Sequence, residues 1–405
     1  MFRACIFVAL AAVLAACDSG VRSVSTYTVR DSAGVQIIES TAPAWGDGEG
    51  WTVSEEPTLH IGVIEGADEY QFSIVTGVFE RDGGIVVGDA SGEVRIFGQT
   101  GTFLSAFGRQ GEGPGEFRRL GWVAPFRGDS IAAWDSPGQR LSVFAGDGTF
   151  ARAVSPPPLV PPTPDGTDRL VWIAGGMTGA LEDGTFLGSS GTVFRGQPGQ
   201  RVVGLTHLVV FSQLGDSLRS IGPFEVETRF PDVAAALRLL TPYQRAFQFT
   251  QRSGGVFILD GPNFEIEDLA LDGSLERVLR ASHVDLRLTD AHRQTYSDSE
   301  RLRLRDDADP GALERALLEA DFPETIPPAS QLLVDSENHL WVRHYTTRWT
   351  VGPEHWSVFS PEGFLLGVVQ TPERLQVRQI EADFLLGIWT DELDVRYIRK
   401  YGLER

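Results

Sequence analysis

Residues 85–117 read IVVGDASGEVRIFGQTGTFLSAFGRQGEGPGEF, a series of short apolar runs separated by turn-forming residues. The runs IVVGD, VRIF and FLSAF have the length and composition of β-strands, and residues 131–154 repeat their order as IAAWD, RLSVF and FARAV. A further short apolar stretch precedes each group. Each repeat therefore contains four strands joined by tight turns, which predicts a fold built from similar small sheets.

Four looser copies follow, and the ends of the series predict how the fold closes. The last copy contains strand-like residues 384–389 and 395–401 and then ends without a fourth strand. Residues 58–62 precede the first copy, in the place that residues 103–107 take before the second. We therefore expect strands from both termini to share one sheet. The sequence predicts an all-β fold, a six-bladed β-propeller of four-stranded antiparallel blades closed by strands from both termini, with a small helical insertion at residues 283–328.

The glycine-rich connection GRQGEGPGEF, residues 108–117, fits this architecture. The fourth strand of a blade is the outermost and the next blade begins at the central axis, so the chain must bend sharply between them. Glycines allow the positive φ angles of such a bend, and Pro114 stiffens it. A phosphate-binding loop is the alternative, but the G-x-G-x-x-G spacing would need glycine where Glu116 stands.

The N-terminus has the features of a bacterial export signal. The apolar run from Ile6 to Leu14 is too short to cross a bilayer core of about 30 Å. Residues 14–17, Leu-Ala-Ala-Cys, resemble the lipobox of bacterial lipoproteins, in which the cysteine becomes the acylated first residue. An ordinary secreted protein with a chance cysteine is the alternative.

These features divide the chain into parts and predict its location. We predict a lipoprotein signal peptide at 1–16, lipidation of Cys17, an anchor linker at 17–26 and the propeller at 27–405. The protein is then extracytoplasmic and lipid-anchored at a bacterial membrane, facing the periplasm or exposed on the cell surface. Cys5 and Cys17 are the only cysteines, so the mature propeller has no disulfide.

Composition and motifs disfavour several functions. The net charge of −20 at pH 7 disfavours nucleic acid as a partner. The catalytic motifs H-E-x-x-H, G-x-S-x-G and S-x-x-K do not occur in the sequence. We predict no catalytic residue, no metal-binding residue, no cofactor and a monomeric protein.

Residues 85–117 resemble an NHL-type repeat, in which an apolar strand ending in Asp is followed by a turn, an Arg-apolar-x-Phe strand and a glycine-rich link to Phe. More broadly, residues 27–405 resemble the six-bladed β-propeller lipoproteins of environmental bacteria. The landmarks are VRDSAGV (29–35), GRQGEGPGEF (108–117), LLVDSENHLWV (332–342) and DELDVRYIRKYGL (391–403). The resemblance implies a propeller fold and export, and it brings no established activity or catalytic set.

Two acid–arginine pairs recur at the same place in consecutive copies. Asp89 with Arg95, and Asp135 with Arg140, join the end of the second strand to the start of the third. Catalytic residues are rarely duplicated by repeats, so we interpret these as ion pairs that brace the blades, with a ligand role as the alternative.

The insertion at 283–328 predicts two helices. One begins at Leu288-Thr289-Asp290 and runs toward Arg305, and Asp309-Pro310 caps the other, in which Leu313, Leu317 and Leu318 have helical spacing. We expect these leucines to pack against copies four and five and the insertion to wall one side of the channel mouth. A bracket on the rim is the alternative.

The candidate ligand-binding residues are Arg343, His344, His339 and Asp391. His339, Arg343 and His344 lie in the fifth copy, with His355 after a break, and could form a metal or anion site. Packed or rim-exposed side chains are the alternative. Arg343, placed between blades, would need a carboxylate partner, for which Asp391 and Glu392 are candidates by their order in the chain.

The sequence predicts a membrane-anchored extracytoplasmic propeller that binds a protein, peptide or saccharide through loops at one end of the ring. The alternative is a metal-dependent lyase or lactonase acting in the central channel. The chain has only two asparagines, Asn263 and Asn338, which counts against the calcium-dependent lactonases of the gluconolactonase and paraoxonase type. We therefore expect binding rather than catalysis, with an enzyme still open.

Cys17→Ala should give an unprocessed or unanchored protein, because the acylated sulfur is then missing. Membrane fractionation and mass spectrometry of the mature N-terminus measure this, with Cys5→Ala as the control that should be processed normally. A Cys17→Ala protein that stays with membranes after a high-salt wash would show that lipidation is not the anchor.

Overall fold

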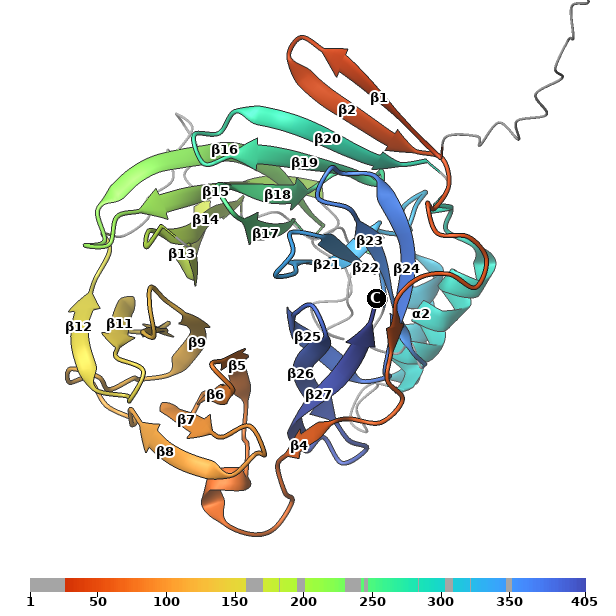
Figure 1. Cartoon of the computed structure of the whole chain (residues 1–405). Helices are drawn as coiled ribbons and strands as arrows, with labels where there is room; N and C mark the ends of the chain where they lie inside the picture. The colour runs from red at the N-terminus through yellow and green to blue at the C-terminus, as the bar shows by residue number, and fades with distance from the viewer. Residues whose placement is uncertain are drawn as a thin grey trace, which may run out of the picture.

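Six four-stranded antiparallel units surround a central axis, as the repeats predict (Figure 1). The structure is a computed structural model, which describes residues 26–157, 170–181, 183–194, 201–229, 242–243, 247–282, 284–302, 309–320, 322–346 and 352–405. Cys17, the predicted signal peptide and most of the anchor linker lie outside the described residues. No helix among the described residues is long and apolar enough to span a membrane.

The strands of each blade are given from the innermost to the outermost. Blade 1 contains β5 (Val75–Arg81), β6 (Gly84–Asp89), β7 (Glu93–Phe97) and β8 (Phe103–Phe107). Blade 2 contains β9 (Leu120–Pro125), β10 (Ile131–Asp135), β11 (Arg140–Phe144) and β12 (Phe150–Val154). Blade 3 contains β13 (Leu170–Ala180), β14 (Phe186–Phe194), β15 (Arg201–Phe211) and β16 (Ser217–Arg229). Blade 4 contains β17 (Gln248–Arg252), β18 (Gly255–Leu259), β19 (Glu265–Ala270) and β20 (Leu275–Ala281). Blade 5 contains β21 (Ala329–Val334), β22 (Leu340–His344), β23 (Glu354–Phe359) and β24 (Leu365–Thr371). Blade 6 contains β25 (Leu375–Ile380), β26 (Phe384–Thr390), β27 (Arg396–Glu404) and the N-terminal β4 (Leu59–Ile61).

The predicted closure by both termini is confirmed. β4 pairs antiparallel with β27, with Ile61 opposite Ile398 and Leu59 opposite Lys400. A single-turn 3-10 helix, Asp68–Tyr70, lies in the connection from β4 to blade 1. The N-terminal strand thus takes the outer position of the last blade, where the C-terminal copy has no strand of its own.

The residues before β4 form a belt around three blades that the repeats did not predict. The hairpin of β1 (Tyr27–Ser32) and β2 (Val35–Ser40) extends blade 4, because β2 pairs in parallel with β20. Trp45 then donates its backbone N–H to Leu366 of β24, and β3 (Thr52–Val53) pairs with the end of β27. The belt runs along the outer edges of blades 4, 5 and 6 (Figure 1).

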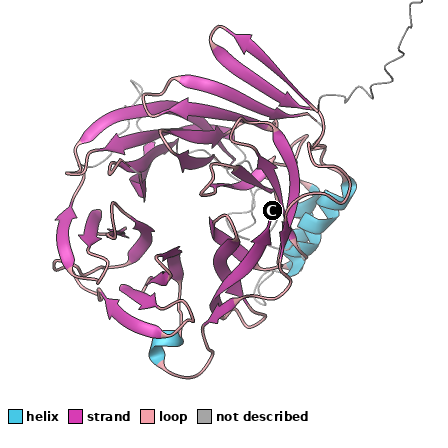
Figure 2. Cartoon of the chain, viewed as in Figure 1, coloured by secondary structure: helices cyan, strands magenta, loops and turns pink. Residues whose placement is uncertain are grey.

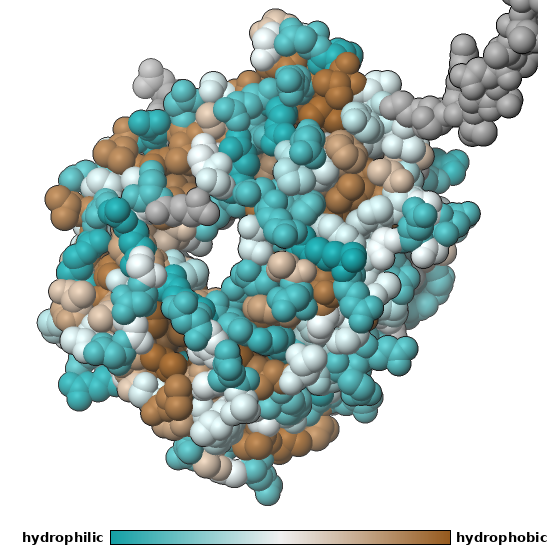
Figure 3. Space-filling model, viewed as in Figure 1, coloured by the Kyte–Doolittle hydropathy of each residue, from teal (hydrophilic) through white to brown (hydrophobic). Residues whose placement is uncertain are grey.

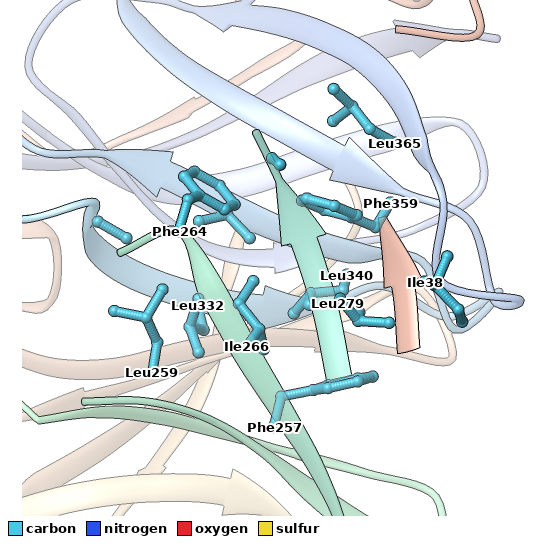
Figure 4. Close-up of a cluster of buried hydrophobic side chains, with 13 residues drawn as sticks. Ile38, Phe257, Leu259, Phe264, Ile266, Leu279, Leu332, Leu340, Phe359 and Leu365 are labelled. Carbon is cyan, nitrogen blue, oxygen red and sulfur yellow. The ribbon is translucent and has the colours of Figure 1, made fainter. Parts of the chain in front are cut away.

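Apolar side chains between neighbouring blades form the core. Between blades 4 and 5, Phe257 and Leu279 lie in one buried cluster with Phe359 and Leu365, and Ile38 of β2 joins them (Figure 4). Burying each such side chain contributes about 1.5–3 kcal/mol. Because each blade is covered on both faces, its inner strands are apolar without clean alternation.

The glycine-rich connection is a structural crossing. Gly108 has φ 77°, and a Cβ there would lie 2.7 Å from the carbonyl oxygen of Gly92. Phe117 is fully buried at the end of the crossing. The Glu116 carboxylate accepts hydrogen bonds from Arg109 and from the backbone of Gly113, so it fills the loop where a phosphate would have to lie.

The predicted Asp89–Arg95 ion pair is wrong. Arg95 pairs with Glu93 at 3.0 Å. The Asp89 carboxylate instead accepts hydrogen bonds from Ser73 and Ser91. Ser73 lies in the connection that enters blade 1, so Asp89 fastens that connection to the end of β6.

The second predicted pair is present but long, with Arg140 Nη2 3.8 Å from Asp135. Asp135 also accepts hydrogen bonds from the backbone N–H groups of Arg118 and Arg119, which enter blade 2. The duplicated aspartates therefore have one structural role, which is to hold the incoming chain.

The two predicted helices of the insertion are present as α2 (Asp290–Leu302) and α3 (Pro310–Leu318). Asp309 caps α3 by accepting a hydrogen bond from the Gly311 N–H at 2.9 Å. Leu313 and Leu317 are buried, but Leu318 is 87% exposed, so its predicted burial is wrong. Residues 317 and 318 point about 100° apart on a helix and cannot both face the ring.

The helices do not wall the channel mouth. Figure 2 shows both of them outside the ring, beside blade 5 and away from the central opening. Leu313 and Leu317 form a small cluster with Tyr243 and Tyr296, and Tyr345 packs against it. The insertion is thus fixed to the periphery of blade 5 through the residue that follows His344.

Deleting residues 18–62 should cause aggregation, because it leaves the outer edges of β20 and β27 unpaired and uncovers the side chains that pack against β4. Size-exclusion chromatography and thermal unfolding measure this, and deletion of residues 18–25 alone serves as the control that should fold normally. A monomeric 18–62 deletion protein with an unchanged melting temperature would refute the closure.

Candidate ligand-binding site

One end of the ring carries the insertion, and we call it the insertion face. Ala329, where β21 begins, pairs with His344, where β22 ends, so the chain entering β21 and the turn after β22 lie at this end. In blade 6, Leu375 at the start of β25 pairs with Trp389 near the end of β26. The turn at 391–394 therefore lies at the same end.

Arg343 lies at this face and is held by two residues of its own blade. Its Nε donates to Ser330 Oγ at 2.9 Å, and its Nη1 lies 3.3 Å from the Glu354 carboxylate. The guanidinium lies 5.9 Å from the centre of the Trp356 ring. The carboxylate partner is thus Glu354 on the neighbouring strand, and the expectation of Asp391 or Glu392 was wrong, since cross-strand order decides the contact.

His344 lies beside Arg343 but is directed to the other side of the strand. Its Nε2 lies 2.8 Å from Ser357 Oγ, and its ring is stacked on His355 with ring centres 6.1 Å apart. The two histidines are cross-strand neighbours because Arg343 pairs with Trp356. Strand alternation therefore separates Arg343 from the histidine pair.

His339 lies at the opposite end of blade 5. It contacts the buried carboxylate of Asp335, which also accepts hydrogen bonds from Trp341 at 3.1 Å and Arg405 at 2.7 Å. The Arg405 guanidinium is stacked on Trp51 of the belt, 4.3 Å from the ring centre. His339 is thus part of a clamp on the C-terminal residue, far along the strand from Arg343.

Asp391 lies at the insertion face but in a turn of blade 6. Its carboxylate accepts hydrogen bonds from the N–H groups of Leu393 and Val395 and from the Tyr397 hydroxyl. Partial burial opposes ionisation, but these hydrogen bonds outweigh it and lower the Asp391 pKa. The structure therefore brings Arg343 and His344 to one face, with Asp391 in the next blade, and leaves His339 at the other end.

Sequence reasoning missed Arg378 of β25. It lies near Arg343, and burial together with that second guanidinium lowers its pKa. Its Nη2 donates to Gln376 Oε1 at 2.9 Å, and its Nε is buried without a hydrogen-bond partner among the described residues. The signal in the sequence is that Arg378 is the one charged residue of the inner strand LQVRQI, in which the other side chains are apolar or amides.

The ring is open along its axis. Figure 3 shows an opening at the centre of the molecule, with hydrophilic side chains on much of its border. Among the described residues, no group of three or more His, Cys, Asp or Glu side chains could hold a metal ion.

No family model matches the chain, and no curated protein matches it. Among solved structures, a candidate exported protein of Bacteroides fragilis is 13% identical with TM-score 0.47, covering 91% of this chain and 98% of its own. A DUF4221 family member of Bacteroides vulgatus is 8% identical with TM-score 0.48, covering 88% and 99%. A streptogramin B lyase is 9% identical with TM-score 0.36, covering 87% and 97%. At these values the fold assignment rests on the sheet topology itself.

Asp335→Asn should destabilise the fold by about 2–4 kcal/mol, because a buried, multiply hydrogen-bonded carboxylate is lost beside Arg405. Denaturant unfolding measures this, and Glu337→Gln, which removes the exposed partner of the same arginine, should cost less than about 0.5 kcal/mol.

The difference between wild type and Asp335→Asn should also depend on pH. Burial would raise the Asp335 pKa, but the hydrogen bonds from His339 and Trp341 outweigh it and hold the pKa below the ordinary 3.8. The ionised Asp335 carboxylate therefore contributes its full share of the free energy of unfolding above pH 3.8, and this share is lost as the pH falls through the lowered pKa. A constant difference from pH 7 to pH 2 would contradict this assignment.

Proposed function

We propose that this protein is an extracytoplasmic binding propeller, lipid-anchored through Cys17, which recognises a protein, peptide or saccharide at its insertion face. The observation that carries the proposal is that the helical insertion, which a plain ring does not need, joins the ring at this face. The insertion packs against Tyr345, which directly follows Arg343 and His344. Arg343 and the Asp391 turn lie at the adjoining ends of blades 5 and 6.

The start of the described chain supports an anchored orientation. Tyr27 pairs with Ser40, which pairs with Ala281 immediately before the insertion, so the belt begins at the insertion face. Cys17 precedes Tyr27 by ten residues. A chain of that length spans at most about 35 Å. A lipid on Cys17 therefore keeps the insertion face near the bilayer, where a membrane-associated partner would meet it.

The insertion offers apolar contacts that the fold does not use. Leu302 of α2 is 80% exposed and Leu318 of α3 is 87% exposed. Large apolar side chains that cost little to remove are suitable probes of a binding surface. We expect Leu302→Ser with Leu318→Ser to leave the melting temperature unchanged and to abolish cross-linking of the native lipoprotein to its partner in membranes.

Leu214→Ser is the matched control, because Leu214 is 77% exposed in the β15–β16 turn, at the other end of its blade. The control should cross-link like wild type. Equal cross-linking of all three proteins would show that the insertion is only a bracket.

A metal-dependent lyase or lactonase acting in the channel is the second candidate, favoured by the open axis of the ring. Elemental analysis of the purified chain from residue 18 separates the two functions. We predict no stoichiometric divalent ion. One tightly bound divalent ion per chain would favour the enzyme.

A further inference from the structure

Two arginines lie at the boundary between blades 5 and 6, near the insertion face and beside one carboxylate. Arg343 comes from β22 of blade 5 and Arg378 from β25 of blade 6. Gln331, the cross-strand partner of Arg343, donates to the backbone carbonyl of Val377 at 3.3 Å, so the inner strands of the two blades meet beside Arg378. Glu354 pairs with Arg343. The described residues provide Arg378 with one neutral acceptor, the Gln376 amide, and leave its buried Nε without one. A buried donor without an acceptor costs free energy. Arg378 is only partly buried, so the rest of its guanidinium has N–H donors that an acceptor from outside the chain can reach.

Arg378 lies at a β-bulge in β25, and an arginine is unusual at this position of the blades. The innermost strands of five blades each contain a single-residue bulge, at Thr76, Gly121, Thr178, Ser330 and Arg378, and β13 has a second register shift between Ile173 and Gly176. A bulge turns its side chain away from the ladder, and such positions often re-aim a side chain at a site. Four of these five positions carry a small residue, Thr, Gly, Thr or Ser, so a small side chain is enough for the bulge. The long, charged side chain of Arg378 in blade 6 is therefore not required to form the bulge.

We propose that Arg378 and Arg343 together bind a carboxylate group of the ligand at the channel side of blades 5 and 6. Two guanidinium charges and the Glu354 charge leave one positive charge, which a singly charged anion balances and a phosphate dianion exceeds. The planar guanidinium matches the two oxygens of a carboxylate. The inference rests on the proposed function, because it assigns the chemistry of the group recognised at that face.

Small probes test the inference on the purified chain from residue 18, by calorimetric titration at constant ionic strength. Galacturonate is compared with galactose, and N-acetylglycine with N-acetylglycinamide, so each acid has a neutral partner of similar shape. These pairs also distinguish an acidic sugar from a peptide terminus as the source of the carboxylate. Inorganic phosphate is the third probe. We expect one or both acids to bind and their neutral partners not to bind.

Arg378→Gln should weaken binding of the acids by about tenfold or more, since a charge-assisted pair of hydrogen bonds is lost. Arg374→Gln is the control, because Arg374 precedes β25, is exposed and loses the same charge. Arg378→Lys should bind with intermediate affinity, because it keeps the charge and loses the planar fork.

Glu354→Gln should change the affinity for the acids in the opposite direction from Arg378→Gln. It removes the anion that competes for Arg343, so the acids should bind more tightly than to wild type. Equal binding of acids and neutral partners, tighter binding of phosphate than of the acids, or equal weakening by Arg378→Gln and Arg374→Gln would overturn the inference. If Arg378→Gln does not fold, the Glu354→Gln and Arg378→Lys results decide.

The outcomes separate this inference from the proposed function. Loss of membrane cross-linking in the Leu302→Ser, Leu318→Ser protein, without any binding of acids to wild type, would remove the carboxylate site and keep the insertion face as a binding surface. Binding of the acids without any membrane partner would keep the site and remove the partner.

Discussion

The pairing of β4 with β27 is the contact on which the rest of the ring depends. An open series of blades would leave the faces of the first and last blades uncovered. Ile61 and Ile398 lie opposite each other in this pair, and both are packed with Ile85 of blade 1. The pairing therefore completes blade 6 and at the same time covers its contact with blade 1. It also fixes where the N-terminal chain must end, and the belt follows from that constraint.

The sequence was most informative where copies agree with one another. The strand runs at 85–107 and 131–154 fold as predicted, because tight turns and apolar runs determine them locally. The belt could not be predicted in this way, since β1 to β3 belong to no repeat and their partners lie far along the chain. The predicted burial of Leu318 and the predicted Asp89–Arg95 ion pair were wrong, because sequence spacing alone does not show which neighbour a side chain can reach.

The candidate site was harder to predict for a related reason. Arg343 and His344 could be selected as unusual residues, but strand alternation directs their side chains to opposite sides. Glu354 was not selected, because it becomes a neighbour of Arg343 only through β-pairing. Arg378 depends on a bulge that the sequence does not mark. Repeated positions of this chain support the fold, since Asp89 and Asp135 hold the chain that enters each blade. The helical insertion and Arg343, which occur once, lie at the insertion face, whereas the Asp335–Arg405 clamp lies at the other end.

A disulfide across the closure tests the central claim of a ring joined by its two ends. His60 and Arg399 are cross-strand partners whose side chains already lie 3.1 Å apart, and a chain from residue 18 has no other cysteine. We predict that His60→Cys with Arg399→Cys forms an intramolecular disulfide in the folded protein, because paired strand positions have suitable geometry. His60→Cys with Asp383→Cys should remain reduced. Free thiols at positions 60 and 399 in a folded monomer under oxidising conditions would contradict the closed ring.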